Sequence, residues 1–175
     1  MLAAICVPMF PEGALSWIQE LRARHDPQHH RLVAPHVTVV YPTSASPEAA
    51  FVAHVASCAR ETKRAAVEFS SVREFRDEAA GLHLAYLVAG AGSDLFLRLR
   101  ERLYSGPLVH AARRDIPFIP HVTLGRFASA ADAASVAAGI RVGLRSIAGR
   151  VEAVDVVRIE EGHVDTIHRE PLRAG

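Results

Sequence analysis

Cysteine and lysine are both scarce in this chain of 175 residues. The two cysteines, Cys6 and Cys58, could form one disulfide, but two thiols in an apolar-rich chain are more typical of core residues in a reduced protein. Lys63 is the only lysine, so arginine carries nearly all of the positive charge. The cysteine content therefore predicts a cytoplasmic protein.

An excess of charge of either sign is also missing. The chain has 20 basic and 19 acidic residues, which give a formal net charge of +1 at pH 7 with neutral histidines. No global basic field is available to hold a long nucleic acid. A polyanionic ligand would have to be bound by local groups.

The beginning of the sequence lacks a long apolar segment. Residues 1–8 contain a short apolar run with no basic region before it, too short for a signal peptide or a membrane span. We expect a buried strand there and no contact with a membrane. The apolar content of 50% and the length suit one domain, or two small lobes that share a core.

Hydrophobic periodicity predicts an α+β protein with an internal repeat. Strands are predicted at residues 2–7, 32–41, 66–75, 82–88, 118–127, 151–159 and 164–167. Helices are predicted at residues 11–25, 47–62, 93–104 and 130–142. A helix, a strand that carries a histidine, a second helix and a further strand occur twice. This order predicts two similar lobes that face each other rather than two independent domains.

A four-residue motif occurs identically in both halves of the repeat. Pro-His-Val-Thr is found at residues 35–38 and again at residues 120–123, each time at the start of an apolar strand. One His-x-Thr alone would carry little information, because the chain has 10 histidines. The identical duplication at equivalent positions is far more specific.

Strand geometry predicts where these motif residues point. Side chains at positions i and i+2 of a strand share a face, so His36 lies beside Thr38 and His121 beside Thr123. Two-fold pseudo-symmetry would bring two imidazoles and two hydroxyls to one cleft. A neutral imidazole can take a proton from water while a protonated one donates to a leaving oxygen, and threonine hydroxyls can donate to phosphate oxygens. The motifs therefore predict a phosphoesterase that needs no metal.

These motifs resemble those of the two-histidine (2H) phosphoesterase superfamily, whose members carry a His-hydrophobic-Ser/Thr-hydrophobic motif in each lobe. The superfamily includes the RNA 2′,3′-cyclic phosphodiesterases, also called 2′-5′ RNA ligases, and eukaryotic cyclic phosphodiesterases. Residues 118–126 are similar to the second motif of the RNA-ligase-like branch, whereas residues 40–42 depart from the usual continuation of the first.

The resemblance implies a bilobal, pseudo-two-fold α+β fold over residues 1–175, with two antiparallel sheets flanked by helices and a central cleft. It implies that His36 and His121 are catalytic and that Thr38 and Thr123 contact phosphate. It implies no cofactor. The expected partner is a nucleotide or an RNA terminus with a cyclic or 2′-linked phosphate, and we expect a monomer.

Three further residues are candidate substrate contacts. Strict alternation places Arg126 opposite His121, so it would reach the cleft only through a bulge or at the strand end. Tyr41 likewise falls opposite His36, which favours a packed ring over a wall that stacks on a base. Arg114, in the loop before the second motif, could reach a substrate or be solvated.

Other polar and aromatic residues have simpler interpretations. We expect packing roles for Tyr86 and Phe10, and a half-buried position for His83. The group at His25, His29 and His30 lacks a matching acidic or cysteine partner, so we expect no metal there. Three arginines of the helix predicted at residues 93–104 are expected to form a solvated face: Arg98, Arg100 and Arg102.

Four functions remain open on the sequence alone. The first is a hydrolase that opens a 2′,3′-cyclic phosphate, or a 2′-5′ ligase that runs the related reaction in reverse. The second is a phosphoesterase for a small cyclic nucleotide or ADP-ribose cyclic phosphate, slightly favoured by the low net charge. The third is a non-catalytic module that binds a nucleotide or an RNA end. The fourth, a metal-dependent hydrolase, is disfavoured by the motif spacing.

Overall fold

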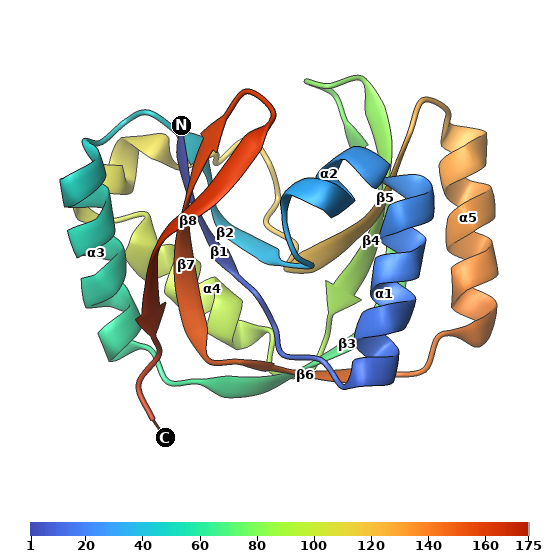
Figure 1. Ribbon diagram of the computed structural model, residues 1–175, viewed down its shortest axis with the longest axis horizontal. Helices are drawn as coiled ribbons and strands as arrows, with labels where there is room; N and C mark the ends of the chain where they lie inside the picture. Colours follow the sequence, from blue (N-terminus) through green and yellow to red (C-terminus); the bar gives the residue numbers. More distant parts are fainter. Residues whose placement is uncertain (175) are drawn as a thin grey trace.

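The computed structural model describes residues 1–174, which form two four-stranded antiparallel sheets with helices on their outer faces (Figure 1). The strands are β1 (Leu2–Cys6), β2 (Val37–Thr43), β3 (Ala65–Asp77), β4 (Leu82–Ala89), β5 (His121–Phe127), β6 (Ile147–Val151), β7 (Ala153–Glu160) and β8 (His163–Pro171). The helices are α1 (Glu12–His25), α2 (Pro27–Leu32), α3 (Glu48–Glu61), α4 (Asp94–Leu103), a 3-10 helix (Gly106–Ala111) and α5 (Ala130–Gly143). The predicted α+β fold with two sheets is confirmed.

The two sheets have equivalent strand orders. The first sheet has the order β2-β1-β7-β8 and the second the order β5-β4-β3-β6. Each motif strand, β2 or β5, is therefore the edge strand of its own sheet. The motifs occupy equivalent places in two lobes, as the repeat predicts.

The longer helix in the segment before each motif strand packs on the opposite lobe. Helix α1 precedes β2 but packs against β5, and α4 precedes β5 but packs against β2. Helices α3 and α5 complete the outer layers of the first and second sheet respectively (Figure 1). This exchange of helices ties the lobes together.

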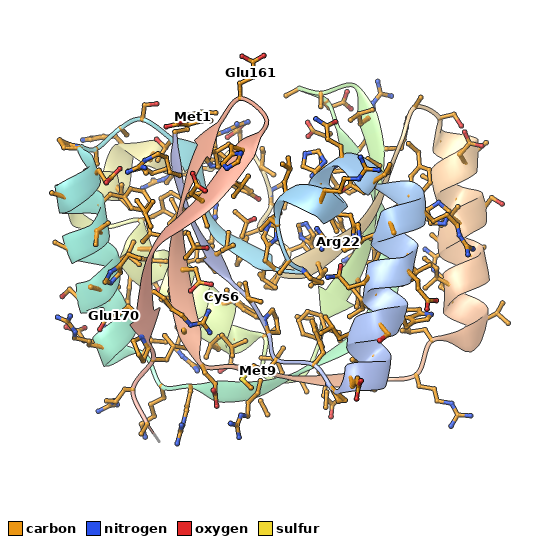
Figure 2. The ribbon with its side chains drawn as sticks, viewed as in Figure 1. Met1, Cys6, Met9, Arg22, Glu161 and Glu170 are labelled. Atoms are coloured by element: carbon orange, nitrogen blue, oxygen red, sulfur yellow. The ribbon has the colours of Figure 1, made fainter. Side chains whose placement is uncertain are left out.

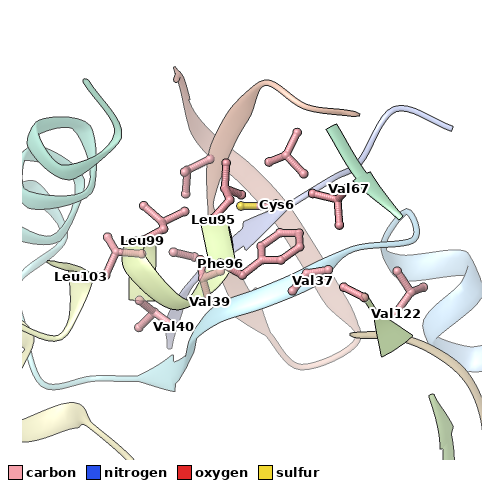
Figure 3. Packing of buried hydrophobic residues seen from close by; sticks show 14 of the residues in the cluster. Cys6, Val37, Val39, Val40, Val67, Leu95, Phe96, Leu99, Leu103 and Val122 are labelled. Carbon is pink, nitrogen blue, oxygen red and sulfur yellow. The ribbon is translucent and has the colours of Figure 1, made fainter. Parts of the chain in front are cut away.

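One large hydrophobic core contains residues of both sheets and therefore joins the lobes. Figure 3 shows Cys6, Val37 and Val39 of the first sheet packed with Phe96 of α4, beside Val122 of the second sheet. Val37 and Val122 follow the two motif histidines directly, and each is only 1% exposed. Burial of these two valines anchors both motif strands.

Both cysteines are buried and free, so no disulfide joins Cys6 to Cys58. None of the helices in residues 1–174 has the length and apolar character needed to cross a membrane.

Candidate active site

The two motif strands lie side by side where the lobes meet, and both line one cavity of about 450 Å³. His36 and Thr38 reach it from the first sheet, and His121 and Thr123 from the second. The structure thus brings together the four motif side chains that the sequence identified. A cavity of this size suits one small ligand.

Both imidazoles are oriented by the same local hydrogen bond. Nδ1 of His36 donates to the carbonyl of Ala34 at 2.8 Å, and Nδ1 of His121 donates to the carbonyl of Ile119 at 2.5 Å. A carbonyl can only accept, so each neutral ring carries its proton on Nδ1. Each Nε2 is left as the free basic nitrogen.

The pKa values of both histidines are lowered. Burial is the main cause, and it lowers the pKa of His36 to about 4, with further lowering by the nearby guanidinium groups of Arg22 and Arg126. Burial also lowers the pKa of His121 to about 4, with smaller contributions from His36 and Arg126. Both rings are therefore neutral near pH 7 in the free protein. An anionic ligand would favour the protonated form of an imidazole beside it.

Tyr86 supports His121 inside the cavity. The two rings stack with centroids 3.4 Å apart and an angle of 17° between their planes, and Phe75 stacks behind Tyr86 at 5.6 Å. Burial raises the pKa of the Tyr86 phenol, so it stays neutral. The sequence favoured a packing role for Tyr86; the ring does pack, but it packs on a motif histidine and lines the cavity.

A β-bulge turns Arg126 into the cavity. Gly125 pairs with Ala85, but the next pair joins Thr123 to Tyr86, so Leu124 is an extra residue in β5. The extra residue reverses the alternation, and Arg126 then shares a face with Thr123 and lines the cavity. Such a bulge is one of the two ways in which the sequence allowed Arg126 to reach the cleft.

The first motif strand has a bulge at the equivalent position. Thr38 pairs with Ile5 and Val40 with Ala4, so Val39 is the extra residue. Tyr41 therefore also returns to the cavity face, three residues after the motif threonine, as Arg126 does in β5. The preference for Tyr41 as a core ring was wrong, because strict alternation does not hold across the bulge.

Arg126 is held by a buried carboxylate. Its Nε donates to Oδ2 of Asp26 at 3.1 Å, and Nδ1 of His29 lies 2.7 Å from the other oxygen of Asp26. Burial alone would raise the pKa of Asp26, but the contacts with His29 and Arg126 outweigh it and leave the pKa below its usual value. Asp26 is thus an anion that positions a cation over the cavity.

Arg22 is a second cation at the cavity and is only 2% exposed. Its guanidinium donates to the carbonyls of Val33 and His29, at 2.8 Å and 3.3 Å. Figure 2 shows Arg22 on α1, close to α2. Arg22 thereby ties α1 to the segment that leads into His36. The sequence places Arg22 on the apolar stripe of its helix, the one signal that could have marked it.

Several candidates lie elsewhere. Arg114 is exposed and does not line the cavity. Phe10 packs edge-on against Phe69 with centroids 5.2 Å apart, as expected for a packing residue. Within residues 1–174, no group of three or more histidine, cysteine or acidic residues is arranged to hold a metal ion.

The prediction of a solvated face was wrong for Arg100. Its guanidinium lies between 4.4 and 4.9 Å from the ring centres of Tyr41, Tyr104 and Phe118. It also donates to the carbonyl of Val39, the bulged residue, at 3.2 Å. Arg100 therefore supports Tyr41 from outside the cavity.

Two apolar patches form the walls of the cavity. The wall from the first sheet is aliphatic and centres on Ala3, Ile5 and Val157. The wall from the second sheet contains Leu84 and the aromatic ring of Tyr86. The polar groups between these walls can bind an anion while the walls contact a less polar body. The arrangement suits a phosphate attached to an organic group.

The paired sheets, with one histidine motif on each, and the match to a family model place the chain among the two-histidine phosphoesterases. More narrowly, the chain belongs to the 2′-5′ RNA ligase superfamily, whose family model matches residues 10–163. Membership of this superfamily supports an enzyme that acts on phosphate esters.

Individual proteins show the same likeness. One relative is a protein of Geobacillus kaustophilus that carries the name putative phosphoesterase. It is 30% identical over 130 residues, which cover 72% of this chain and 70% of the relative. Usb1 of Kluyveromyces marxianus has a similar structure, with a TM-score of 0.62 and 12% identity over 98% of both chains. LigT of E. coli in complex with 3′-AMP has a TM-score of 0.56 and 16% identity, over 98% of this chain and 97% of LigT. At these identities, the two structures support the fold alone.

Proposed function

We propose that this protein is a metal-independent phosphoesterase that hydrolyses a 2′,3′-cyclic phosphate or a related 2′-linked phosphodiester. One observation carries the proposal: two imidazoles, each with Nε2 free and each beside a threonine, line a single cavity from opposite lobes. Opposed acid–base groups are what in-line attack at phosphorus requires. The same pair could run the reverse reaction and join RNA ends through a 2′-5′ bond.

The proposed roles follow from the contacts of each residue. One histidine takes a proton from the attacking water, and the other, protonated once the anion is bound, donates to the leaving oxygen. Thr38 and Thr123 donate hydrogen bonds to the non-bridging oxygens, where negative charge must be stabilised. Arg126, held by Asp26, supplies a positive charge to the same group.

A nucleotide is the proposed substrate body. The solved structures of the fold include LigT with 3′-AMP and Usb1 with uridine monophosphate, so those two proteins bind nucleotides. Here Tyr41 supplies an aromatic ring on the cavity face that can stack on a base, whereas both faces of the Tyr86 ring are already covered by His121 and Phe75.

We expect the purified protein to hydrolyse nucleoside 2′,3′-cyclic monophosphates in the presence of EDTA. Phosphomonoester formation, measured by chromatography with and without the chelator, tests this result. Equal rates support the two-histidine scheme. Turnover that EDTA abolishes contradicts the metal-independent chemistry, and tight nucleotide binding without turnover of any cyclic phosphate indicates a binding module instead.

Substitution of either motif threonine is expected to reduce turnover moderately. Thr38→Val or Thr123→Val removes one hydrogen bond to a charged phosphate, which is worth about 1.5–3 kcal/mol, or roughly a 10- to 100-fold loss in kcat. The matched controls are Thr38→Ser and Thr123→Ser, which keep the hydroxyl and should retain most activity. Steady-state kinetics that show equal losses in the valine and serine variants would assign the threonines a packing role.

A further inference from the structure

The charges around the cavity are unevenly distributed. Of the described residues that line it, the only arginines or lysines are Arg22 and Arg126, which lie beside the motif residues. Three carboxylates also line the cavity, and one of these, Asp26, is already paired with Arg126 and His29. The other two are Asp77 and Glu160.

Asp77 and Glu160 occupy similar places on the two lobes. Asp77 ends β3, where it pairs with Leu82, and Glu160 ends β7, where it pairs with His163. Each therefore stands at the start of a hairpin turn. The two hairpins point to the same edge of the molecule in Figure 1, and Glu161 marks the tip of the β7–β8 hairpin in Figure 2.

The arginines that lie close to these two carboxylates in the sequence are paired with other acidic residues. Arg76 forms an ion pair with Glu78 at 3.0 Å, and Arg158 with Glu48 at 2.7 Å. Within residues 1–174, neither Asp77 nor Glu160 forms an ion pair of its own. Two carboxylates without an ion-pair partner among these residues therefore line the hairpin end of the cavity, while the cations lie next to the motif histidines.

We infer that Asp77 and Glu160 restrict the site to a small substrate with a single phosphate group and disfavour the end of an RNA chain. This inference rests on the proposed function. The phosphate that reacts would lie between the histidines, near Arg22 and Arg126. An RNA end adds a further negative charge with each nucleotide, and these charges would lie toward the carboxylates. A nucleoside 2′,3′-cyclic monophosphate carries no such second charge.

The test compares two substrates that share the same reacting group. One is a nucleoside 2′,3′-cyclic monophosphate, and the other is a short RNA that ends in the same cyclic phosphate. We expect the wild type to have the higher kcat/KM for the mononucleotide. Asp77→Asn combined with Glu160→Gln should reduce this preference about four-fold at low ionic strength, since two like charges at about 10 Å in water change an equilibrium roughly two-fold per pair. The effect should vanish in about 1 M salt, where the Debye length is about 3 Å.

The choice of variants limits other effects. In the β3–β4 turn, Oδ1 of Asp77 accepts hydrogen bonds from the amides of Ala79 and Ala80, and asparagine keeps that oxygen. The control is Glu12→Gln combined with Glu101→Gln, which removes the same charge from exposed positions on α1 and α4, outside the cavity lining. This control should leave the substrate preference unchanged.

Each outcome decides the inference. Equal or better turnover of the RNA by the wild type, or an unchanged preference in the variant that lacks both carboxylates, overturns it. Failure of the wild type to turn over either substrate contradicts the proposed function instead. In that case, the dissociation constants of a nucleoside 2′-monophosphate and of an RNA with a 2′-phosphate end test the selectivity without turnover. Tighter binding of the mononucleotide that weakens in the variant supports the inference. Equal binding of the two ligands refutes it.

Discussion

Alanine in place of His36 or His121 is expected to lower kcat for cyclic phosphate hydrolysis by about 10²- to 10⁴-fold in each case. Each ring presents one free Nε2 to the cavity, and the two rings come from opposite lobes. Loss of one ring removes either the base or the acid, and the remaining ring cannot act in both roles in one step. Replacement of both rings should cost little more than replacement of one, because they act as a unit.

The measurement is single-turnover kinetics of both single variants and the double variant, with thermal unfolding to verify the fold. His110→Ala is a suitable control, because His110 is exposed on the 3-10 helix and does not line the cavity. His36→Asn and His121→Asn can still donate a hydrogen bond to the carbonyls of Ala34 and Ile119, so they separate the loss of chemistry from a loss of local order. Full turnover in the double variant would refute the two-histidine mechanism.

The fold was predictable where local patterns and tertiary packing agree. The helix predicted at residues 130–142 begins where Ser129 acts as its N-cap, because the Ser129 side chain accepts a hydrogen bond from the amide of Asp132. The turn between β3 and β4 forms where the sequence places Asp77 and Gly81, and Gly81 has a φ of 67° that suits glycine. The duplicated motif could be located in two equivalent strands because identical residues in identical positions require similar surroundings.

The predicted boundaries of helices and strands were wrong where two elements follow each other closely in the sequence. One strand was predicted at residues 151–159, but β6 ends at Val151 and β7 starts at Ala153, and the two strands belong to different sheets. No helix was predicted between residues 25 and 32, but the short helix α2 begins at Pro27, with one residue between it and the end of α1. Proline also suits the first turn of a new helix, so the residue type alone does not distinguish the two cases.

The site could be predicted only in part, for the same physical reason at several positions. The bulges at Val39 and Leu124 depend on pairing with β1 and β4, and no residue type in the motif specifies them. Arg126 and Tyr41 reach the cavity only through these bulges. Arg22 lies in α1, and Asp26 is the residue after this helix. Because α1 packs on the opposite lobe, the closeness of both residues to the motifs depends on tertiary structure.

The low pKa values of the two histidines predict that activity depends strongly on pH. In the free protein, burial lowers the pKa of both His36 and His121 to about 4, below the ordinary value of 6.5. The proposed mechanism needs one ring protonated and the other neutral. Above the pKa values, the fraction of free protein with one proton on the pair falls ten-fold for each pH unit. The two apparent values belong to the pair rather than to either ring.

We therefore expect kcat/KM to fall by about ten-fold per unit from pH 5 to pH 8, since it reports the free enzyme. The profile of kcat should instead be bell-shaped and centred closer to neutrality, because bound phosphate raises the pKa of the protonated ring. Substrate binding would then take up a proton, which calorimetry in buffers of different ionisation enthalpy can measure. Rates at constant ionic strength, with an NMR titration of the free imidazoles, test both statements. A kcat/KM maximum between pH 6 and 7 would show that the buried cleft does not hold its histidines neutral, and that the acid is already in place before substrate binds.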